Sequence, residues 1–309
     1  LKPSRYVREV YLDPDQNNQR VRQNILNAGI YAQLQTKLFT GFELMAGLRL
    51  DNATYFNKGN FSQLVYDELG LRTDNGLSTF QIQPRVQITW DFNDKHTDIL
   101  RIGGGIFASD INNYAMINNM VFDGTKVMSV DIKNTEEEPD IVPTPDFIGY
   151  RKDPSTAPGI DLLNNPKYAD KAVPTINMNS KDAKVPVVYK ANISYTHFFS
   201  DRLKMSVSGY MTLGRNNYMY IDRNMVDDPY FRLSAEGNRG IYVPASTIGK
   251  DGTLDWMEGR KSTKVGRVLE LVSEGKVNQF AFTVDGTWRY YKDGELSFSY
   301  TWNDTKDNT

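Results

Sequence analysis

The amino-acid sequence predicts an all-β fold, an antiparallel transmembrane β-barrel segment of eight or nine strands with long extracellular loops. Three observations predict it. Apolar and polar residues alternate along stretches of eleven to fifteen residues, short and long connections alternate between these stretches, and aromatic residues gather beside the short connections. Because successive side chains of a strand point to opposite faces, each stretch would form a strand with one apolar and one polar face.

Each predicted strand shows this alternation when the residues are taken in order. The strands are expected near 22–38, 42–56, 79–92, 98–109, 187–197, 203–213, 278–290 and 296–304. Each strand contains an apolar residue next to a polar one. In the same order of strands, such pairs are Leu34 and Gln35, Leu48 and Arg49, Val86 and Arg85, Ile102 and Arg101, Ile193 and Ser194, Val207 and Ser206, Phe282 and Thr283, and Phe298 and Ser297. The apolar member of each pair would face lipid, and the polar member, like Lys190, would face the barrel lumen. A ninth strand with poorer alternation is expected at 265–272, and Pro84 predicts a local bulge because it cannot donate to the ladder.

The connections sort by length. Short ones are expected at 39–41, 93–97, 198–202 and 291–295, and long ones at 57–78, 110–186 and 214–277. A meander with short turns at one end and long loops at the other is typical of a bacterial outer-membrane barrel, whose short turns face the periplasm. A soluble β-sandwich also alternates, but its strands run about five or six residues, whereas these are long enough for a tilted crossing of the hydrocarbon layer.

Aromatic residues flank the short turns. They are Phe39, Phe42, Trp90, Phe92, Phe198, Phe199, Trp288 and Tyr290. Amphipathic rings favour the headgroup level of a bilayer, so these residues predict an aromatic girdle at the periplasmic interface.

The composition argues against several other classes of protein. The chain has 309 residues with 36 basic and 38 acidic side chains, and this balance gives no basic field for nucleic acid. No stretch approaches the roughly eighteen apolar residues of a membrane helix. The absence of cysteine removes disulfides and thiolate metal sites. The chain opens LKPSRY, without an initiator methionine or a signal peptide, and is therefore expected to be a piece of a longer precursor.

A family resemblance appears at residues 83–109, which read QPRVQITWDFNDKHTDILRIGGGIFAS. This stretch resembles TonB-dependent outer-membrane receptors of the Oar-like group, which carry a carboxypeptidase-regulatory-like N-terminal domain. The matching residues are Pro84, Arg85, Trp90, Asp91, Leu100, Arg101, Gly103, Gly105, Ile106 and Phe107, whereas Gln83 and Ile102 depart from the pattern. The stretches GIYAQLQTKL and FELMAGLRLD, together with ISYTHFF (193–199) and LSFSYTWNDTKDN (296–308), also look like strands of that family.

The resemblance implies a barrel of about twenty-two strands filled by a plug. The plug, the signal peptide and the TonB-contacting segment would lie outside this chain, which would be an interior part of the one barrel domain, 1–309. The implied function is TonB-dependent, energy-coupled passage of an unidentified substrate across the outer membrane, with outer-membrane lipid, the plug and TonB as partners. A different class remains open: a non-transporting adhesin or assembly scaffold that a barrel anchors in the membrane.

The sequence shows no arrangement of residues that is typical of a catalytic or metal-binding site. His96 and His197 lack the spacing of metal ligands and are expected to be exposed turn residues. The segment 13–18, DPDQNN, begins like a calcium loop but has Asn18 where that loop needs glycine. The glycines at 103–105 lie inside a strand, where they would let another backbone or the plug approach closely. No catalytic residue, cofactor or metal is therefore expected, and the protein is not expected to be an enzyme.

Two sets of residues remain as candidates for function. Five charged residues are expected on the polar face near the short turns, facing either the plug or channel water: Arg85, Asp91, Arg101, Asp285 and Arg289. The loop 110–186 is expected to recognise a ligand or a surface partner through Tyr114, Met116, Asn118, Met120 and Phe122, since loops this long are functional or disordered. Its apolar content predicts that much of it is ordered; the alternative is a mobile, variable loop without a binding role.

Overall fold

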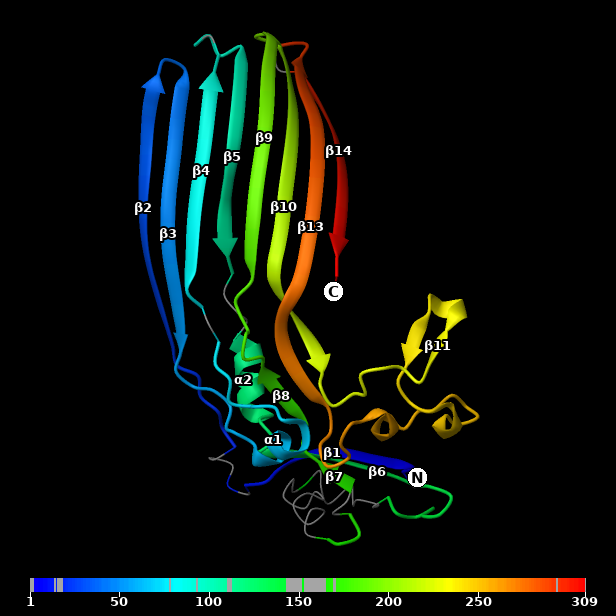
Figure 1. Cartoon of the computed structure of the whole chain (residues 1–309). Helices are drawn as coiled ribbons and strands as arrows, with labels where there is room; N and C mark the ends of the chain where they lie inside the picture. The colour runs from blue at the N-terminus through cyan, green and yellow to red at the C-terminus, as the bar shows by residue number, and fades with distance from the viewer. Residues whose placement is uncertain are drawn as a thin grey trace.

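The structure, a computed structural model, describes residues 3–13, 15, 19–77, 79–92, 94–109, 113–142, 152, 165–168, 171–292 and 294–308. Its main feature is one sheet whose eight long strands lie side by side in the order in which they occur in the chain, each antiparallel to its neighbours (Figure 1). The strands are β2 (Ile25–Phe39), β3 (Phe42–Tyr55), β4 (Gln81–Asp91), β5 (Asp98–Ala108), β9 (Val187–Ser200), β10 (Leu203–Asp222), β13 (Val268–Arg289) and β14 (Glu295–Asp307).

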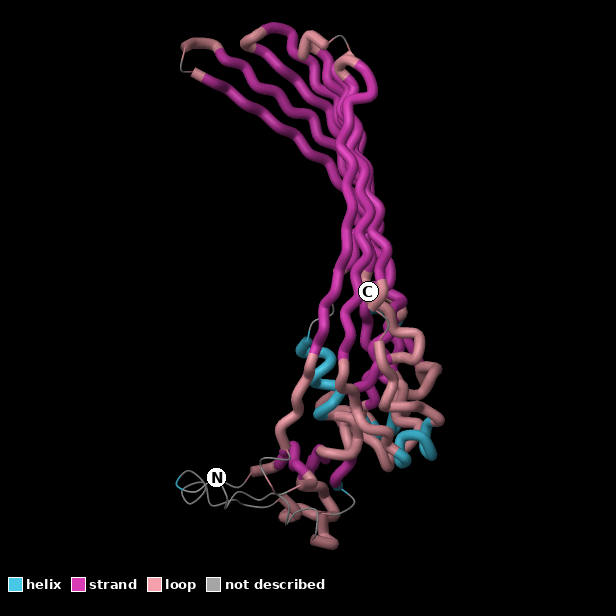
Figure 2. The backbone as a smooth tube through the Cα atoms, turned by 90° about the vertical axis from the view of Figure 1, so that its left-hand side faces the viewer, coloured by secondary structure: helices cyan, strands magenta, loops and turns pink. Residues whose placement is uncertain are grey.

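The register places the apolar residues of neighbouring strands side by side. Ile102 of β5 pairs with Ile88 of β4 and with Ile193 of β9. The six residues expected to face lipid are between 40% and 60% exposed; they are Leu34, Leu48, Val86, Ile102, Ile193 and Val207. The strands form a single layer away from the loops (Figure 2), and no described element covers this apolar face. An apolar face of this extent is suited to hydrocarbon and not to water.

The opposite face of the sheet is polar. Ser208 donates a hydrogen bond to Ser194 at 2.9 Å, and the hydroxyls of Thr283 and Thr301 lie 2.9 Å apart. These hydroxyl pairs bridge adjacent strands on the face that would line an aqueous lumen. The protein therefore has the predicted all-β fold, a segment of an outer-membrane-type β-barrel with one face for lipid and one for water.

The described helices are short. Within the described part of the chain, none combines the length and the apolar composition that a membrane crossing requires.

Aromatic rings contact one another at the short-turn end of the sheet. Phe39 stacks on Phe42 with 4.7 Å between ring centroids, and both rings meet Trp90 edge-on. Trp90 in turn contacts Phe92, so the girdle is continuous from β2 to the end of β4. Phe198 is an exception. It pairs with Lys204 and therefore lies on the polar face, opposite to the face of its neighbours.

The long connections contain more secondary structure than the sequence predicts. The connection 57–78 holds α1 (Gln63–Leu69), and the connection 110–186 holds α2 (Asn113–Val121), β6 (Val127–Lys133), β7 (Ala172–Val173) and β8 (Ile176–Asn179). β1 (Arg5–Tyr11) pairs with β6, which pairs with β7, and β8 runs parallel to the start of β13. The third connection holds β11 (Phe231–Leu233), β12 (Arg239–Ile241) and the 3-10 turns η3 (Ser234–Glu236), η4 (Ala245–Thr247) and η5 (Trp256–Gly259).

Two expectations about the sheet are wrong. The expected loop 214–277 is strand at both ends, since β10 continues to Asp222 and β13 begins at Val268, absorbing the weak strand at 265–272. The pairing of β10 with β13 shifts register between Gly214 and Asn217 and again before Met219. A register shift interrupts period-two alternation, which hid these strand ends in the sequence.

The bulge expected at Pro84 is also absent. Pro84 pairs with Leu48 within an uninterrupted register between β3 and β4. The pairing of β4 with β5 extends only to Arg85. Pro84 thus lies just beyond that ladder, where its missing N–H removes no hydrogen bond to β5.

The described loops pack into hydrophobic clusters at the end of the sheet opposite the short turns. One cluster joins α2 to β13 through Met116 and Leu271, and a second joins α1, β8 and β13 through Val65, Met178 and Val268. A third lies in the small sheet of β1 and β6. The loops therefore form an ordered assembly with its own core, which positions the candidate site.

Candidate functional site

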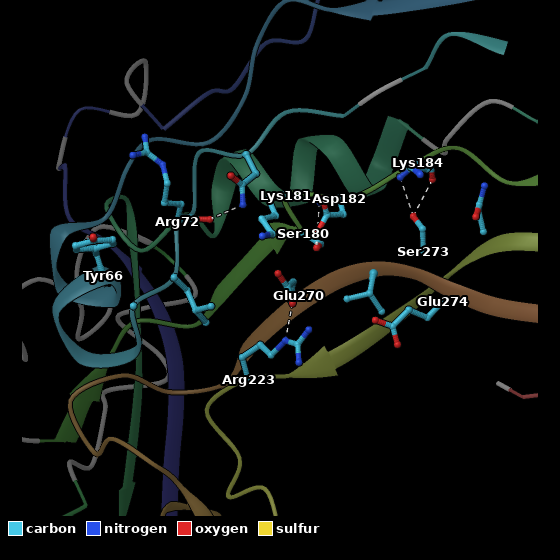
Figure 3. A pocket seen from close by; sticks show the side chains of 15 residues that line it. Tyr66, Arg72, Ser180, Lys181, Asp182, Lys184, Arg223, Glu270, Ser273 and Glu274 are labelled. Carbon is cyan, nitrogen blue, oxygen red and sulfur yellow. Dashed lines mark hydrogen bonds and ion pairs between the residues drawn. The ribbon is translucent and has the colours of Figure 1, made fainter.

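The loop assembly contains an open cavity of about 790 Å³, which we call the loop chamber (Figure 3). Four parts of the chain line it: the end of α1 with the residues after it, the segment 180–184, the end of β10, and the first part of β13. Its volume lies in the range of about 300–1,000 Å³ that is common for ligand pockets.

Helix α1 provides one wall of the loop chamber. The hydroxyl of Ser62 caps its first turn by accepting from the backbone N–H of Val65, and Val65 is fully buried. The helix ends at Gly70, whose left-handed backbone (φ 70°) turns the chain back toward the chamber. This geometry brings Tyr66 and Arg72 to the wall (Figure 3).

The opposite wall is held by polar contacts between strands and loop. Arg223 donates to the carboxylate of Glu270 at 2.5 Å, which joins the end of β10 to β13. The backbone N–H of Lys184 donates to Ser273 Oγ at 2.8 Å, and that hydroxyl donates back to the Lys184 carbonyl at 2.9 Å. The segment 180–184 is thereby fixed against β13.

Both signs of charge line the loop chamber. The charged residues are Arg72, Lys181, Lys184, Arg223, Asp182, Glu270 and Glu274. Arg72 is paired with Asp74 at 2.8 Å and Arg223 with Glu270, so these four charges already bind one another, while Lys181, Asp182, Lys184 and Glu274 add polar groups of both signs to the wall.

Two further contacts hold α1 to the segment that follows β12. Lys264 Nζ and Ser262 Oγ each donate to the Glu68 carboxylate at 2.6 Å. The hydrogen bond from Lys264, followed by that from Ser262, lowers the pKa of Glu68. Asn224 is fully buried and donates its amide to three carbonyls within 262–266, so this segment has a defined conformation.

A second cavity of about 440 Å³ lies on the polar face of β3 and β4, near the loop assembly. Arg49 Nε lies 2.6 Å from the Asp51 carboxylate, and the Gln83 amide donates to the same carboxylate at 2.5 Å. Arg85 lines the cavity beside this network. The polar face thus carries ordered charged groups at the end nearer the loop chamber.

The five charged residues expected near the short turns all lie on the polar face but do not form one cluster. Asp91 accepts from the backbone N–H of His96, and Arg289 pairs with Glu295 at 3.1 Å. Arg101 pairs across strands with Thr89 and Ser194, and Asp285 with Ser206 and Ser299. Arg85 departs from the expectation. It lies toward the loop assembly, because it pairs with Gly105 near the last residues of β5.

The five residues expected to recognise a partner belong to α2 and the turn after it. Tyr114 is 70% exposed, whereas Met116 and Met120 are 2% and 4% exposed and pack inside the loop assembly. Asn118 and Phe122 are half-buried. A contact role at the surface therefore fits Tyr114, whereas the two methionines are core residues. Of the loop 110–186, residues 113–142, 152, 165–168 and 171–186 are described; whether much of the loop is ordered stays a prediction.

Each histidine contacts a carboxylate on a neighbouring segment. His96 Nδ1 lies 2.6 Å from Asp91 and is 80% exposed, and His197 Nδ1 lies 2.6 Å from Asp98. No group of three or more His, Asp or Glu side chains with metal-binding geometry occurs among the described residues. Most of the calcium-like segment 13–18 lies outside the described residues.

The sequence did not predict the loop chamber. Its walls come from residues as distant as Tyr66, Ser180 and Glu270. The parallel pairing of β8 with β13, the Lys184–Ser273 hydrogen bonds and the packing of Val65 bring these segments together, and contacts over so long a separation leave no local pattern in the sequence.

No protein-family model matches the sequence, and no curated protein is similar enough to count as a match. Among solved structures, the chain is similar to the outer-membrane transporter YddB of Escherichia coli, with 11% identity and a TM-score of 0.49 over 91% of this chain and 25% of that chain. It is also similar to the FrpB iron transporter of Neisseria meningitidis, with 9% identity and a TM-score of 0.44 over 92% of this chain and 27% of that chain.

A third similar structure is the alcaligin outer-membrane receptor FauA of Bordetella pertussis, with 14% identity and a TM-score of 0.38 over 92% of this chain and 31% of that chain. The chain thus spans about a quarter to a third of the length of these proteins.

Proposed function

We propose that this chain forms part of the wall and of the outer loops of a bacterial outer-membrane receptor that passes a solute across the membrane. The observation that carries the proposal is the division of the sheet into an uncovered apolar face and a polar face. Lipid solvates the first face, while the second can line an aqueous passage. The loop chamber supports a receptor role because it lies at the end of the sheet that would meet arriving solutes.

The finer proposal concerns energy coupling. The resemblance at residues 83–109 implies that a plug fills the lumen and that TonB drives passage. The polar face supports the plug because hydroxyls and charges such as Arg101 and Asp285 can bond to its polar surface. Among the described residues the outer edges of β2 and β14 have no partner strand, and unpaired edges cannot face lipid. Other strands of the same receptor would close the barrel.

The test compares strains with and without the full-length gene in a defined medium of peptides, oligosaccharides and iron chelates. Mass spectrometry measures which solutes disappear from the medium. We expect the protein in the outer-membrane fraction and at least a tenfold slower loss of one solute class in the deletion strain. A protonophore should abolish the difference because it removes the energy source of TonB.

Loop chamber variants sharpen the test. Lys181→Gln combined with Glu274→Gln removes two exposed charges of the chamber wall, and Lys250→Gln removes an exposed charge outside it. We expect normal membrane assembly for both proteins and slower uptake only for the double variant. If deletion alters no solute but abolishes attachment of cells to a surface or partner, the protein is a scaffold or adhesin and the transport proposal fails.

A further inference from the structure

Two cations on the polar face of the sheet lie around one aromatic ring. The guanidinium carbon of Arg85 is 4.5 Å from the ring centroid of Phe107, and Nζ of Lys190 is 5.8 Å from it. The three residues come from the neighbouring strands β4, β5 and β9. In the register, Gly105 pairs with Arg85 on one side and with Lys190 on the other, so the two cations flank a single glycine.

Two glycines of β5, Gly103 and Gly105, place no side chain between the two neighbouring strands. A Cβ at Gly105 would lie 2.9 Å from Cγ of Arg85, and a Cβ at Gly103 would lie 2.7 Å from Oδ1 of Asn192. The space that a side chain would need at these two positions is therefore occupied by the side chains of Arg85 and Asn192 from the neighbouring strands. The glycine run was expected to admit another backbone or the plug; it admits the side chains of the neighbouring strands, together with their backbone carbonyls.

The charges of Arg85 and Lys190 are not compensated within the described part of the chain. No described carboxylate lies within 4.0 Å of either cationic group, and the hydrogen bond of Arg85 goes to the neutral amide of Gln83 at 3.4 Å. Arg49 on the same face differs, because Asp51 lies 2.6 Å from it. Two like charges on either side of Gly105, both against the Phe107 ring, create a local positive potential, and an anion bound to both would remove their repulsion.

We propose that Arg85, Lys190 and Phe107 form a subsite for an anionic group, a carboxylate or a phosphate, of the solute that the receptor passes. The inference rests on the proposed function, since it places the subsite in the lumen of a transporter. The planar guanidinium fits two oxygens of such a group, and the ammonium adds a second charge. Gln87 and Asn192, which both pair with Gly103, supply neutral amide donors in the next row of the sheet.

The experiment uses the purified full-length receptor in detergent at low ionic strength and measures binding of citrate, inorganic phosphate and neutral glucose by calorimetry. We expect the wild type to bind citrate or phosphate and not glucose. Arg85→Gln combined with Lys190→Gln should weaken anion binding at least tenfold. Arg85→Lys combined with Lys190→Arg should retain most of it because both charges remain.

Lys204→Gln is the matched control. Lys204 is an exposed cation on the same face, but it pairs with Thr287 near the short turns, away from Phe107. Its loss should leave anion binding within twofold of the wild type. Melting temperatures of all variants identify any that fail to fold.

Two results would overturn the subsite. One is a wild type that binds neither anion, as expected if an acidic side chain of the plug already neutralises the cations. The other is a double glutamine variant that binds as well as the wild type. Neither result touches the proposed function, because receptor-dependent uptake of a neutral solute would still demonstrate transport.

Discussion

Arginine in place of Val86 is expected to destabilise the full-length receptor in a lipid bilayer by about 2–4 kcal/mol. Val86 is 46% exposed on the apolar face, in the middle of β4, where it pairs with Ala46 and Gly104. The guanidinium would enter hydrocarbon without a partner. Reversible urea unfolding of the receptor in phospholipid vesicles measures the loss.

Gln87→Arg is the matched control for Val86→Arg. Gln87 is the next residue of the same strand, but it lies on the polar face and pairs with Gly103. A guanidinium there remains in water, so the expected change is within about 0.5 kcal/mol. A similar loss of stability for both variants would show that the two faces meet the same environment.

Met116→Ala is expected to cost the loop assembly about 2–5 kcal/mol, since Met116 is 2% exposed and packs in the cluster that contains Leu271. The effect should be local. Hydrogen exchange should accelerate in α2, in β8 and at the start of β13, while exchange in β3 to β5 stays unchanged.

Tyr114→Ala, two residues earlier in α2, tests recognition separately. Tyr114 is 70% exposed, so its removal should leave hydrogen exchange unchanged. If this residue contacts the solute or a surface partner, uptake or capture falls without any change in folding. Faster exchange in Tyr114→Ala, or unaltered exchange in Met116→Ala, would contradict the division of α2 into a buried and an exposed side.

The sequence predicts the faces of the sheet well because membrane and lumen constrain alternate residues directly. Val207 and Ser206 are assigned correctly from alternation alone, since a strand places neighbours on opposite faces. Alternation fails beyond Gly214, where register shifts in β10 break the period. The strand ends in the loop assembly therefore required the structure.

Alternation also does not predict how far along the barrel axis a residue lies. Arg85 was placed on the correct face but too near the short turns, since it lies in the middle of β4, opposite Gly105 of β5. The same pairing places Arg85 beside Phe107 and across Gly105 from Lys190. Such neighbours come from three strands, and only the register brings them together.

The central claim is that one face of this sheet meets lipid and the other meets water. These 309 residues contain no cysteine. In a series of variants, each with one cysteine at a position from 82 to 90 of β4, the introduced thiol is therefore the only labelling site within these residues. In the full-length receptor, freed of its plug and held in phospholipid vesicles, labelling by a water-soluble maleimide is measured position by position. Labelling is expected at residues 85, 87 and 89 and protection at 82, 84, 86 and 88; positions 83 and 90 do not enter the comparison, because Gln83 is 4% exposed and Trp90 belongs to the aromatic girdle. Labelling that does not alternate along β4, or that alternates in the opposite phase, would contradict the central claim.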